Sequence, residues 1–421
     1  MKRTTRLVIG AAFLVAASLP LVPLAARAGQ RPTPPDLPPT ELARESIDQD
    51  PAVVEARRAL TAAGHGAAAL RAGSHEWTTR LAAQRRRYDN GGNSNEWTAS
   101  LDRTIRIGGK AAIDAQLGDN ELIIGQARIG EARHEAARSL ADLWLDTLAT
   151  SRQRELWAEQ LSFAEASHEA VEKRRKAGDA SVLDLNVARA NLIEVQRQLS
   201  AATTAEAKAR ARLEVRFPML KYEFKAVAEP VELGMTLPQW RDRILAESEP
   251  VKIVEGLLKK AELTAARSNA ERIPDPTVGL YTASEAFRSE RVIGLSLSIP
   301  LPGSYRRERM QQALQEAETA RAAVDRQRRE EEAGIVEAYV DAEGGLARWR
   351  LASQGLSTTR DSARLTQRAY SLGEADLQTL LLARRQALDA STAAEQARAE
   401  ALRWHYRLLV DAHLIWALGE D

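Results

Sequence analysis

Hydrophobic and polar residues alternate strictly over the segment from Arg291 to Leu301. One face of this alternation carries Ile293, Leu295, Leu297, Ile299 and Leu301, and the other carries Gly294, Ser296 and Ser298. A period of two predicts a β-strand over about 290–301 with one apolar and one polar face. A strand of about ten residues is long enough to cross an outer membrane when it is tilted. Residues 276–284 precede it and are expected to form its hairpin partner.

A second pair of alternating segments lies earlier in the chain, at about 76–88 and 97–107, separated by the polar turn 89–96. The apolar face of this pair is interrupted at Arg103. Aromatic residues lie at the strand ends, where membrane strands carry their interfacial girdles: Trp77, Tyr88, Trp97, Tyr281 and Phe287. A soluble hairpin packed on helices is the alternative that this pattern leaves open.

Helical periodicity fills most of the remaining chain. Residues 51–72 are expected to be helical, and a stretch with no proline and little glycine runs from Lys110 to Lys176. At ~1.5 Å per residue this stretch would reach about 100 Å, which is too long for one globular domain. After a break at Gly178 and Asp179, a return helix over about 181–216 carries small residues at heptad spacing: Ala188, Val195, Ala202 and Ala209. The unit is a long antiparallel helical hairpin with a tight tip.

This helical hairpin occurs twice. Residues 177–193 align without a gap on residues 372–388, with five identities that include the tip glycines Gly178 and Gly373. Repetition on this scale indicates two copies of one supersecondary unit. We therefore divide the chain into repeat 1 at 41–235, with its hairpin over about 110–216, and repeat 2 at 236–421, with its hairpin over about 305–418. The fold class is mainly α, with membrane β-strands.

The N-terminus reads as a secretion signal. Residues 1–28 combine a basic start, an apolar stretch and an Ala-Arg-Ala cleavage site, so we expect this signal peptide to be removed. Residues 29–40 are proline-rich and are expected to form an extended strap. The chain has no cysteine, which excludes disulfides and an N-terminal lipidated cysteine. No stretch after residue 28 approaches the length of a transmembrane helix.

Four strands from one chain cannot close a barrel, because small closed barrels need about eight. An open sheet edge cannot persist in lipid, since its amide groups would lack partners. If the strands cross a membrane, several chains must share one barrel, and their helical hairpins would then align into a tube below it. This arrangement implies a membrane pore that continues into a helical tube.

The side chains that carry catalytic or ligand chemistry are scattered. The six histidines lie far apart: His65, His75, His134, His168, His405 and His413. With four methionines and no cysteine, we expect no metal site, no cofactor and no catalytic centre, so the chain is not expected to be an enzyme. The 59 basic residues nearly balance the 58 acidic ones, which gives no support for a nucleic-acid partner.

Several motifs make the chain resemble the TolC-type outer-membrane efflux channels over essentially its whole mature length. They are the tandem repeat, IGGK at 107–110, PDP at 274–276, SIPLPG at 298–303 and YSLGEADLQTLLLARR at 370–385. Within this family, the chain most resembles the branch that serves heavy-metal (cobalt-zinc-cadmium) efflux. The resemblance implies a homotrimer with a shared twelve-stranded barrel in outer-membrane lipid and an α-helical barrel in the periplasm. Its partners would be a periplasmic adaptor protein and an inner-membrane, proton-driven pump of the RND type.

The resemblance also assigns roles to residues. The adaptor-docking tips would be Gly178, Asp179, Ala180, Ser181, Gly373, Glu374, Ala375 and Asp376. A periplasmic gate would involve Asp184 and Tyr370. The chain departs from some relatives at Thr379 and Leu382, where they place an aspartate ring, and at Ala375, where they place an arginine.

Two other classes of protein remain as alternatives. A periplasmic adaptor of an efflux pump also uses a long helical hairpin, but it would carry one hairpin between β-rich domains. A cytosolic coiled-coil scaffold conflicts with the signal peptide and with the alternating strands.

Overall fold

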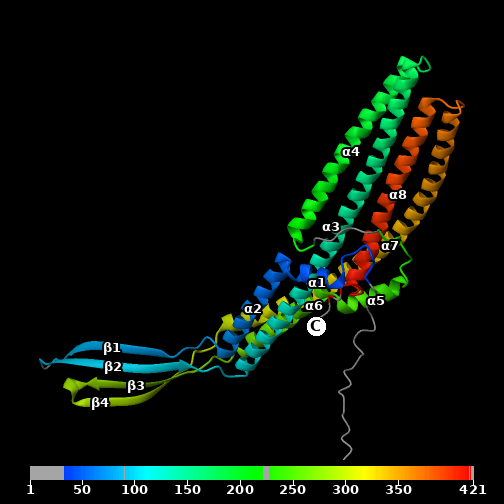
Figure 1. Ribbon diagram of the computed structural model, residues 1–421. Helices are drawn as coiled ribbons and strands as arrows, with labels where there is room; N and C mark the ends of the chain where they lie inside the picture. The colour runs from blue at the N-terminus through cyan, green and yellow to red at the C-terminus, as the bar shows by residue number, and fades with distance from the viewer. Residues whose placement is uncertain (1–32, 90, 221–226, 417, 419–421) are drawn as a thin grey trace, which may run out of the picture.

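The computed structural model describes residues 33–89, 91–220, 227–416 and 418. The expected signal peptide at 1–28 and residues 29–32 of the expected strap lie outside the described residues. A β-sheet projects from one end of a helical region, and two long helical hairpins project from the other end (Figure 1). The predicted fold class, with four antiparallel strands and two long helical hairpins, is confirmed.

The four strands form one antiparallel sheet in the order β1-β2-β3-β4. Their bounds are β1 Thr78–Arg87, β2 Asn93–Thr104, β3 Thr277–Glu285 and β4 Glu290–Ser298. Strands β2 and β3, from different repeats, pair directly and join the β1-β2 and β3-β4 hairpins into one sheet. Within the described residues, β1 and β4 each have a single neighbour, so both edges of the sheet are open.

The register gives the sheet one apolar and one polar face. Leu101 lies opposite Leu280, which lies opposite Leu295, and the neighbouring row joins Ala99, Thr282 and Ile293. The apolar face is uncovered, since Leu295 is 86% exposed in the single chain. Alternate residues on all four strands form the opposite face, which is mostly polar.

Strand β2 begins at Asn93, inside the segment that the sequence predicted as a polar turn, so that prediction was wrong at this end. The physical reason lies on the polar face, where Glu96 is 3% exposed and accepts hydrogen bonds from Gln84 Nε2 (2.9 Å) and the Ala286 amide (3.3 Å). Ser94 is also buried, and its hydroxyl accepts from the Phe287 amide at 2.7 Å. Polar side chains with internal partners sustain a strand that looks like a loop in sequence.

Each long helix packs against several shorter helices along its length. The helices are α1 Thr40–Asp48, α2 Pro51–Ala72, α3 Lys110–Lys176, α4 Val182–Arg216, α5 Leu237–Glu247, α6 Glu249–Ala270, α7 Ser304–Ser371 and α8 Leu377–Asp411. Helix α3 packs on α2 near the sheet and on α4 toward its tip, and α7 packs on α6 and α8 in the same way (Figure 1). None of the described helices has an apolar stretch sufficient to cross a membrane.

Small residues line the contact between α3 and α4. The four predicted heptad positions of α4 are all buried: Ala188, Val195, Ala202 and Ala209. Glu206 interrupts this seam and is buried too, but Arg154 on α3 lies 2.6 Å from its carboxylate and Arg210 lies 3.1 Å away. Because both contacts neutralise the carboxylate, the seam continues through a charged position.

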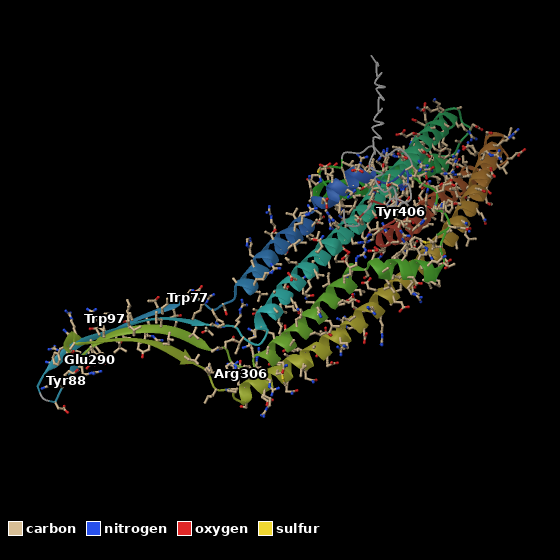
Figure 2. All side chains as sticks on the ribbon, turned by 90° about the horizontal axis from the view of Figure 1, so that it is seen from below. Trp77, Tyr88, Trp97, Glu290, Arg306 and Tyr406 are labelled. Atoms are coloured by element: carbon tan, nitrogen blue, oxygen red, sulfur yellow. The ribbon has the colours of Figure 1, made fainter. Side chains whose placement is uncertain are left out.

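The main hydrophobic core lies midway along the helices and includes the strap. Tyr406, labelled in Figure 2, is buried there, and its hydroxyl donates to Asp36 Oδ1 at 2.7 Å. Trp144 Nε1 donates to the Asp36 carbonyl at 2.5 Å, and Trp416 Nε1 donates to the Pro38 carbonyl at 3.1 Å. The described strap residues are therefore fixed by three buried aromatic side chains from α3, α8 and the C-terminal segment.

Helix α8 ends at Asp411, short of the expected end near residue 418. The chain turns there because His413 adopts a left-handed conformation (φ 55°), and Leu414 N–H donates to the Leu409 carbonyl at 2.8 Å. The turn brings His413 Nε2 to 2.5 Å from His134 Nε2. Burial lowers the pKa of both histidines, that of His134 to about 3, which favours the neutral form of the pair. The described residues include no cluster of three or more histidines and carboxylates able to hold a metal ion.

Two of the motifs singled out in the sequence meet where the sheet joins the helices. Lys110, the last residue of IGGK, is 1% exposed, and its Nζ lies 2.6 Å from Asp275 Oδ1 in PDP. The Ile107 amide donates to the same oxygen at 3.0 Å. Burial opposes ionisation of Asp275, but the contacts with Lys110 and Ile107 lower its pKa. This ion pair connects the start of α3 in repeat 1 to the residues just before β3 in repeat 2.

Candidate functional site at the hairpin tips

The tips of the two helical hairpins lie together at the end farthest from the sheet (Figure 1). Each tip reverses the chain within a few residues, between α3 and α4 and between α7 and α8. All the residues that the resemblance assigned to docking and gating therefore converge on one end of the molecule. Those residues are Gly178, Asp179, Ala180, Ser181, Asp184, Tyr370, Gly373, Glu374, Ala375 and Asp376.

Both tips use the same backbone turn. Gly178 (φ 84°) follows α3, and Gly373 (φ 81°) follows α7, in the left-handed conformation that favours glycine. The Asp179 amide donates to the Arg174 carbonyl at 2.8 Å, and the Glu374 amide donates to the Ala369 carbonyl at 2.9 Å. These are the hydrogen bonds of the Schellman motif, which ends a helix and satisfies its last carbonyls. The repeat thus preserves the tip geometry.

The helices that leave the tips, α4 and α8, are each capped at the N-terminus by a side chain that accepts from a backbone amide. In repeat 1 the Ser181 hydroxyl accepts from the Asp184 amide at 3.0 Å, and the Asp184 carboxylate accepts from the Ser181 amide at 3.0 Å. In repeat 2 the corresponding pair is Asp376 and Thr379, and Asp376 Oδ1 accepts from the Thr379 amide at 2.7 Å. Serine or aspartate serves equally well as the first residue of such a cap.

Arg174 connects the two tips, although the sequence did not single it out. Its Nη1 donates to the Tyr370 hydroxyl at 3.1 Å, and its guanidinium lies 5.8 Å from the centre of the Tyr370 ring. The same side chain donates from Nε to Asp179 Oδ2 at 2.9 Å. One arginine of the first hairpin therefore contacts both its own tip and the last turn of α7 in the second hairpin.

A cavity of about 570 Å³ lies between the tips. It is lined by Val171, Arg174, Asp179, Ala180, Asp184, Tyr370, Ser371, Leu372, Gly373, Ala375, Asp376 and Leu377. Beside it, Val171, Ala188 and Leu377 form a small buried apolar cluster that packs the two hairpins against each other. At the tips, the hairpins are thus joined by this apolar contact and by the polar bridge from Arg174 to Tyr370.

Asp184 and Tyr370 line this cavity but do not bond to each other. The carboxylate of Asp184 is used by Ser181, whose hydroxyl donates to it at 2.8 Å. Hydrogen bonds from the Ser181 hydroxyl and amide lower the pKa of Asp184, so it stays ionised. The structure therefore gives Asp184 a helix-capping role, while the hydroxyl of Tyr370 is held by Arg174.

The two tips differ in charge. Four consecutive basic residues, Lys173 to Lys176, occupy the last turn of α3 and are exposed. The second tip carries the exposed carboxylates of Glu374 and Asp376. A partner that contacts both tips therefore meets a first tip rich in basic side chains, three of them paired with Glu169, Glu172 and Asp179, beside the two carboxylates of the second.

Solved structures share this architecture. The outer-membrane channel OprN superposes with a TM-score of 0.77 at 18% identity, covering 93% of this chain and 94% of that one. The outer membrane protein VceC from Vibrio cholerae gives a TM-score of 0.70 at 17% identity, covering 90% of this chain and 96% of that one. This chain has the fold of these outer-membrane channels. The CusC structure, which concerns transmembrane channel formation, gives 0.66 at 16% identity, covering 90% of this chain and 92% of that one.

No protein-family model and no curated protein sequence matches this chain. The similarity to the solved channels is therefore carried by the fold, which extends over nearly the full length of each. That fold contains the two features from which a function can be argued: the open-edged sheet and the paired hairpin tips.

Proposed function

We propose that this chain is the outer-membrane channel of a tripartite efflux system, a passive exit duct and not an enzyme. The observation that carries the proposal is a four-stranded sheet with an uncovered apolar face and two open edges. The apolar face suits lipid, but the edges do not, because their amide groups must find partners there. Three chains would supply twelve strands and pair every edge, with the helical hairpins aligned below.

The proposed assembly has a defined orientation. Its sheet lies in the outer membrane, and its helical hairpins extend into the periplasm after the signal peptide is cleaved. The tips would then face a periplasmic adaptor protein, which links the channel to an inner-membrane RND pump. Six tips in a trimer, alternately basic and acidic, would form the docking surface.

The rival proposal is a periplasmic adaptor protein. Fractionation followed by a size measurement in detergent separates the two classes of protein. A channel is extracted only with detergent and has the mass of three chains. A soluble monomer recovered from the periplasm would refute the channel.

Within this proposal the tips form the gate. Arg174 joins the two hairpins of one protomer through Tyr370, and Asp184 fixes the start of the return helix beside them. Opening the tube requires the hairpins to separate at this end. The bridge and the apolar cluster at Val171 both resist that separation.

We expect Arg174→Ala and Tyr370→Phe to make the closed channel leakier. Losing one exposed hydrogen bond costs about 1 kcal/mol, so the open population in each protomer should rise about fivefold. Single-channel conductance in planar bilayers measures the change. Arg175→Ala is the matched control, since Arg175 is an exposed neighbour of Arg174 whose side chain makes no hydrogen bond or ion pair with the described residues of the second hairpin. Unchanged closed-state conductance in both variants would show that the hydrogen bond between Arg174 and Tyr370 does not help to hold the channel closed.

We further propose that the exported substrates are heavy-metal cations. The motifs that resemble the metal-efflux branch support this, and so does the polar face of the sheet, which would line the pore. Its strand residues include four carboxylates, Glu96, Asp102, Glu285 and Glu290, against the two bases Arg80 and Arg86. An acidic lining favours cations.

The metal sensitivity of a deletion strain tests the substrate separately from the channel. We expect greater sensitivity to zinc, cobalt or cadmium, restored by the intact gene. Sensitivity to drugs alone would reject the metal substrates while leaving the efflux channel in place.

A further inference from the structure

The charged residues of the apolar face are all arginines. In the paired strands this face carries Arg85 and Arg87 on β1, Arg103 on β2 and Arg291 on β4. Every carboxylate of the four strands lies on the opposite, polar face. Every charged strand residue on the face that the proposed function places against lipid is therefore cationic.

Three of these arginines lie at the end of the sheet far from the helices. Trp97 lies opposite Ala83 and Ser284, and Ser284 lies opposite Arg291, so Arg291 and Trp97 share one row. Arg85 and Arg87 follow Ala83 on the same face of β1, beyond that row. Figure 2 shows Trp77 near the helices and Trp97 farther out, so the two tryptophans mark opposite ends of the apolar band.

The surroundings of these three side chains differ from those of Arg86, which lies between Arg85 and Arg87. Arg86 points to the polar face, where its Nε lies 3.2 Å from Glu96 and its Nη2 lies 3.8 Å from Glu285. Arg85, Arg87 and Arg291 are exposed, and no carboxylate of the four strands lies on their face. On this face of the sheet, the strands supply no negative charge to balance them.

We propose that Arg85, Arg87 and Arg291 bind the phosphate groups of the glycolipid that forms the outer leaflet of the membrane. The inference rests on the proposed function, since it requires the sheet to be in that membrane. Arginine on the lipid face is unfavourable at mid-depth and tolerated near the interface, where a headgroup can reach it. A guanidinium binds phosphate through paired hydrogen bonds, so an anionic lipid is the occupant that this chemistry selects.

Assembly would bring the three arginines together. Strands β1 and β4 are the two edges of one sheet, so closing the barrel places β4 of one protomer beside β1 of the next. Arg291 then lies on the same outer face as Arg85 and Arg87 of the neighbouring protomer. A trimer would have three such seams, each with a cationic site at its outer end.

Binding of lipid A to the purified full-length trimer in detergent tests the proposal. The probes are bisphosphorylated lipid A and the same lipid with its phosphates removed, followed by native mass spectrometry. We expect the intact protein to retain only the phosphorylated lipid. We expect Arg85→Gln/Arg87→Gln/Arg291→Gln to bind it about a hundredfold more weakly, since each of the three charges contributes about fivefold.

Arg80→Gln is the matched control, because Arg80 lies on the same strand but on the polar face. It should bind lipid A like the unaltered protein. Equal binding of both lipids, or undiminished binding by the triple variant, would overturn the inference while leaving a trimeric channel intact. A chain that is monomeric in the same spectra would instead contradict the proposed function.

Discussion

Replacing Leu295 by arginine is expected to prevent stable insertion of the sheet into the outer membrane. Leu295 lies in the row with Leu101 and Leu280 and is almost fully exposed on the apolar face. An arginine at the midplane of a membrane strand costs about 2–4 kcal/mol. A trimer carries three copies, so the total penalty is about 6–12 kcal/mol, comparable to the whole stability of a domain.

The neighbouring residue provides the control for this variant. Ser296 points to the polar face, and its hydroxyl lies 3.3 Å from Asp102 Oδ1, so an arginine there would meet water and a carboxylate. Ser296→Arg should reach the outer membrane in normal amount, whereas Leu295→Arg should be degraded or remain in the periplasm. Immunoblots of the separated membranes measure both. Equal amounts of the two variants would show that the apolar face does not contact lipid.

The second large effect is expected from Gly178→Val combined with Gly373→Val. Both glycines have a positive φ at the tip turns, and a β-branched residue in that conformation costs on the order of 1–3 kcal/mol at each site. The Schellman hydrogen bonds of both tips would be lost or displaced. If the proposed function holds, we expect efflux to be abolished because the proposed adaptor would no longer find its docking surface, although the sheet would still insert.

Asparagine tolerates the left-handed conformation better than other residues with a side chain, so Gly178→Asn/Gly373→Asn keeps the backbone turn. This control should retain most of the efflux activity. Resistance of cells to the exported compounds, measured beside cross-linking of the channel to its adaptor, separates docking from export. Full resistance in the valine variant would mean that the tip geometry is not needed for docking.

The sequence predicted the elements whose signals are local. Helix α3 begins and ends where predicted because Gly109 precedes it and Gly178 follows it, both with positive φ. The alternation at Ile293 and Leu295 identified β4, since the period of two depends only on neighbouring residues. The small heptad residues of α4 likewise indicated its buried face.

Features that depend on distant partners were missed. Lys173, Arg174, Arg175 and Lys176 are alike in sequence, and only the phase of α3 and the packing of the second hairpin select Arg174 to reach Tyr370. The contact of His134 with His413 joins residues 279 positions apart. Within β2, the start at Asn93 depends on partners of Ser94 and Glu96 from other strands and loops.

The role of Asp184 shows a different limit. The resemblance assigned this residue to a gate, which stays a proposal, and the structure adds that its carboxylate accepts hydrogen bonds from the amide and hydroxyl of Ser181. The pattern Ser-x-x-Asp is itself a capping signal, so the local function was readable from the sequence. A resemblance to a family assigns a role to a residue position, and the contacts of that residue show its local structural function.

Disulfide cross-linking between the edge strands tests the closed trimeric barrel most directly. The chain has no cysteine of its own, so Leu81→Cys on β1 can be paired in turn with Ile293→Cys, Leu295→Cys and Leu297→Cys on β4. Within one sheet, β1 and β4 are about 14 Å apart, beyond the reach of a disulfide. Oxidised membranes should therefore yield covalent dimers and trimers from at least one pair, and no larger species. Monomers from every pair would contradict the proposed shared barrel. Covalent species larger than the trimer would indicate an open assembly and contradict the closed trimer.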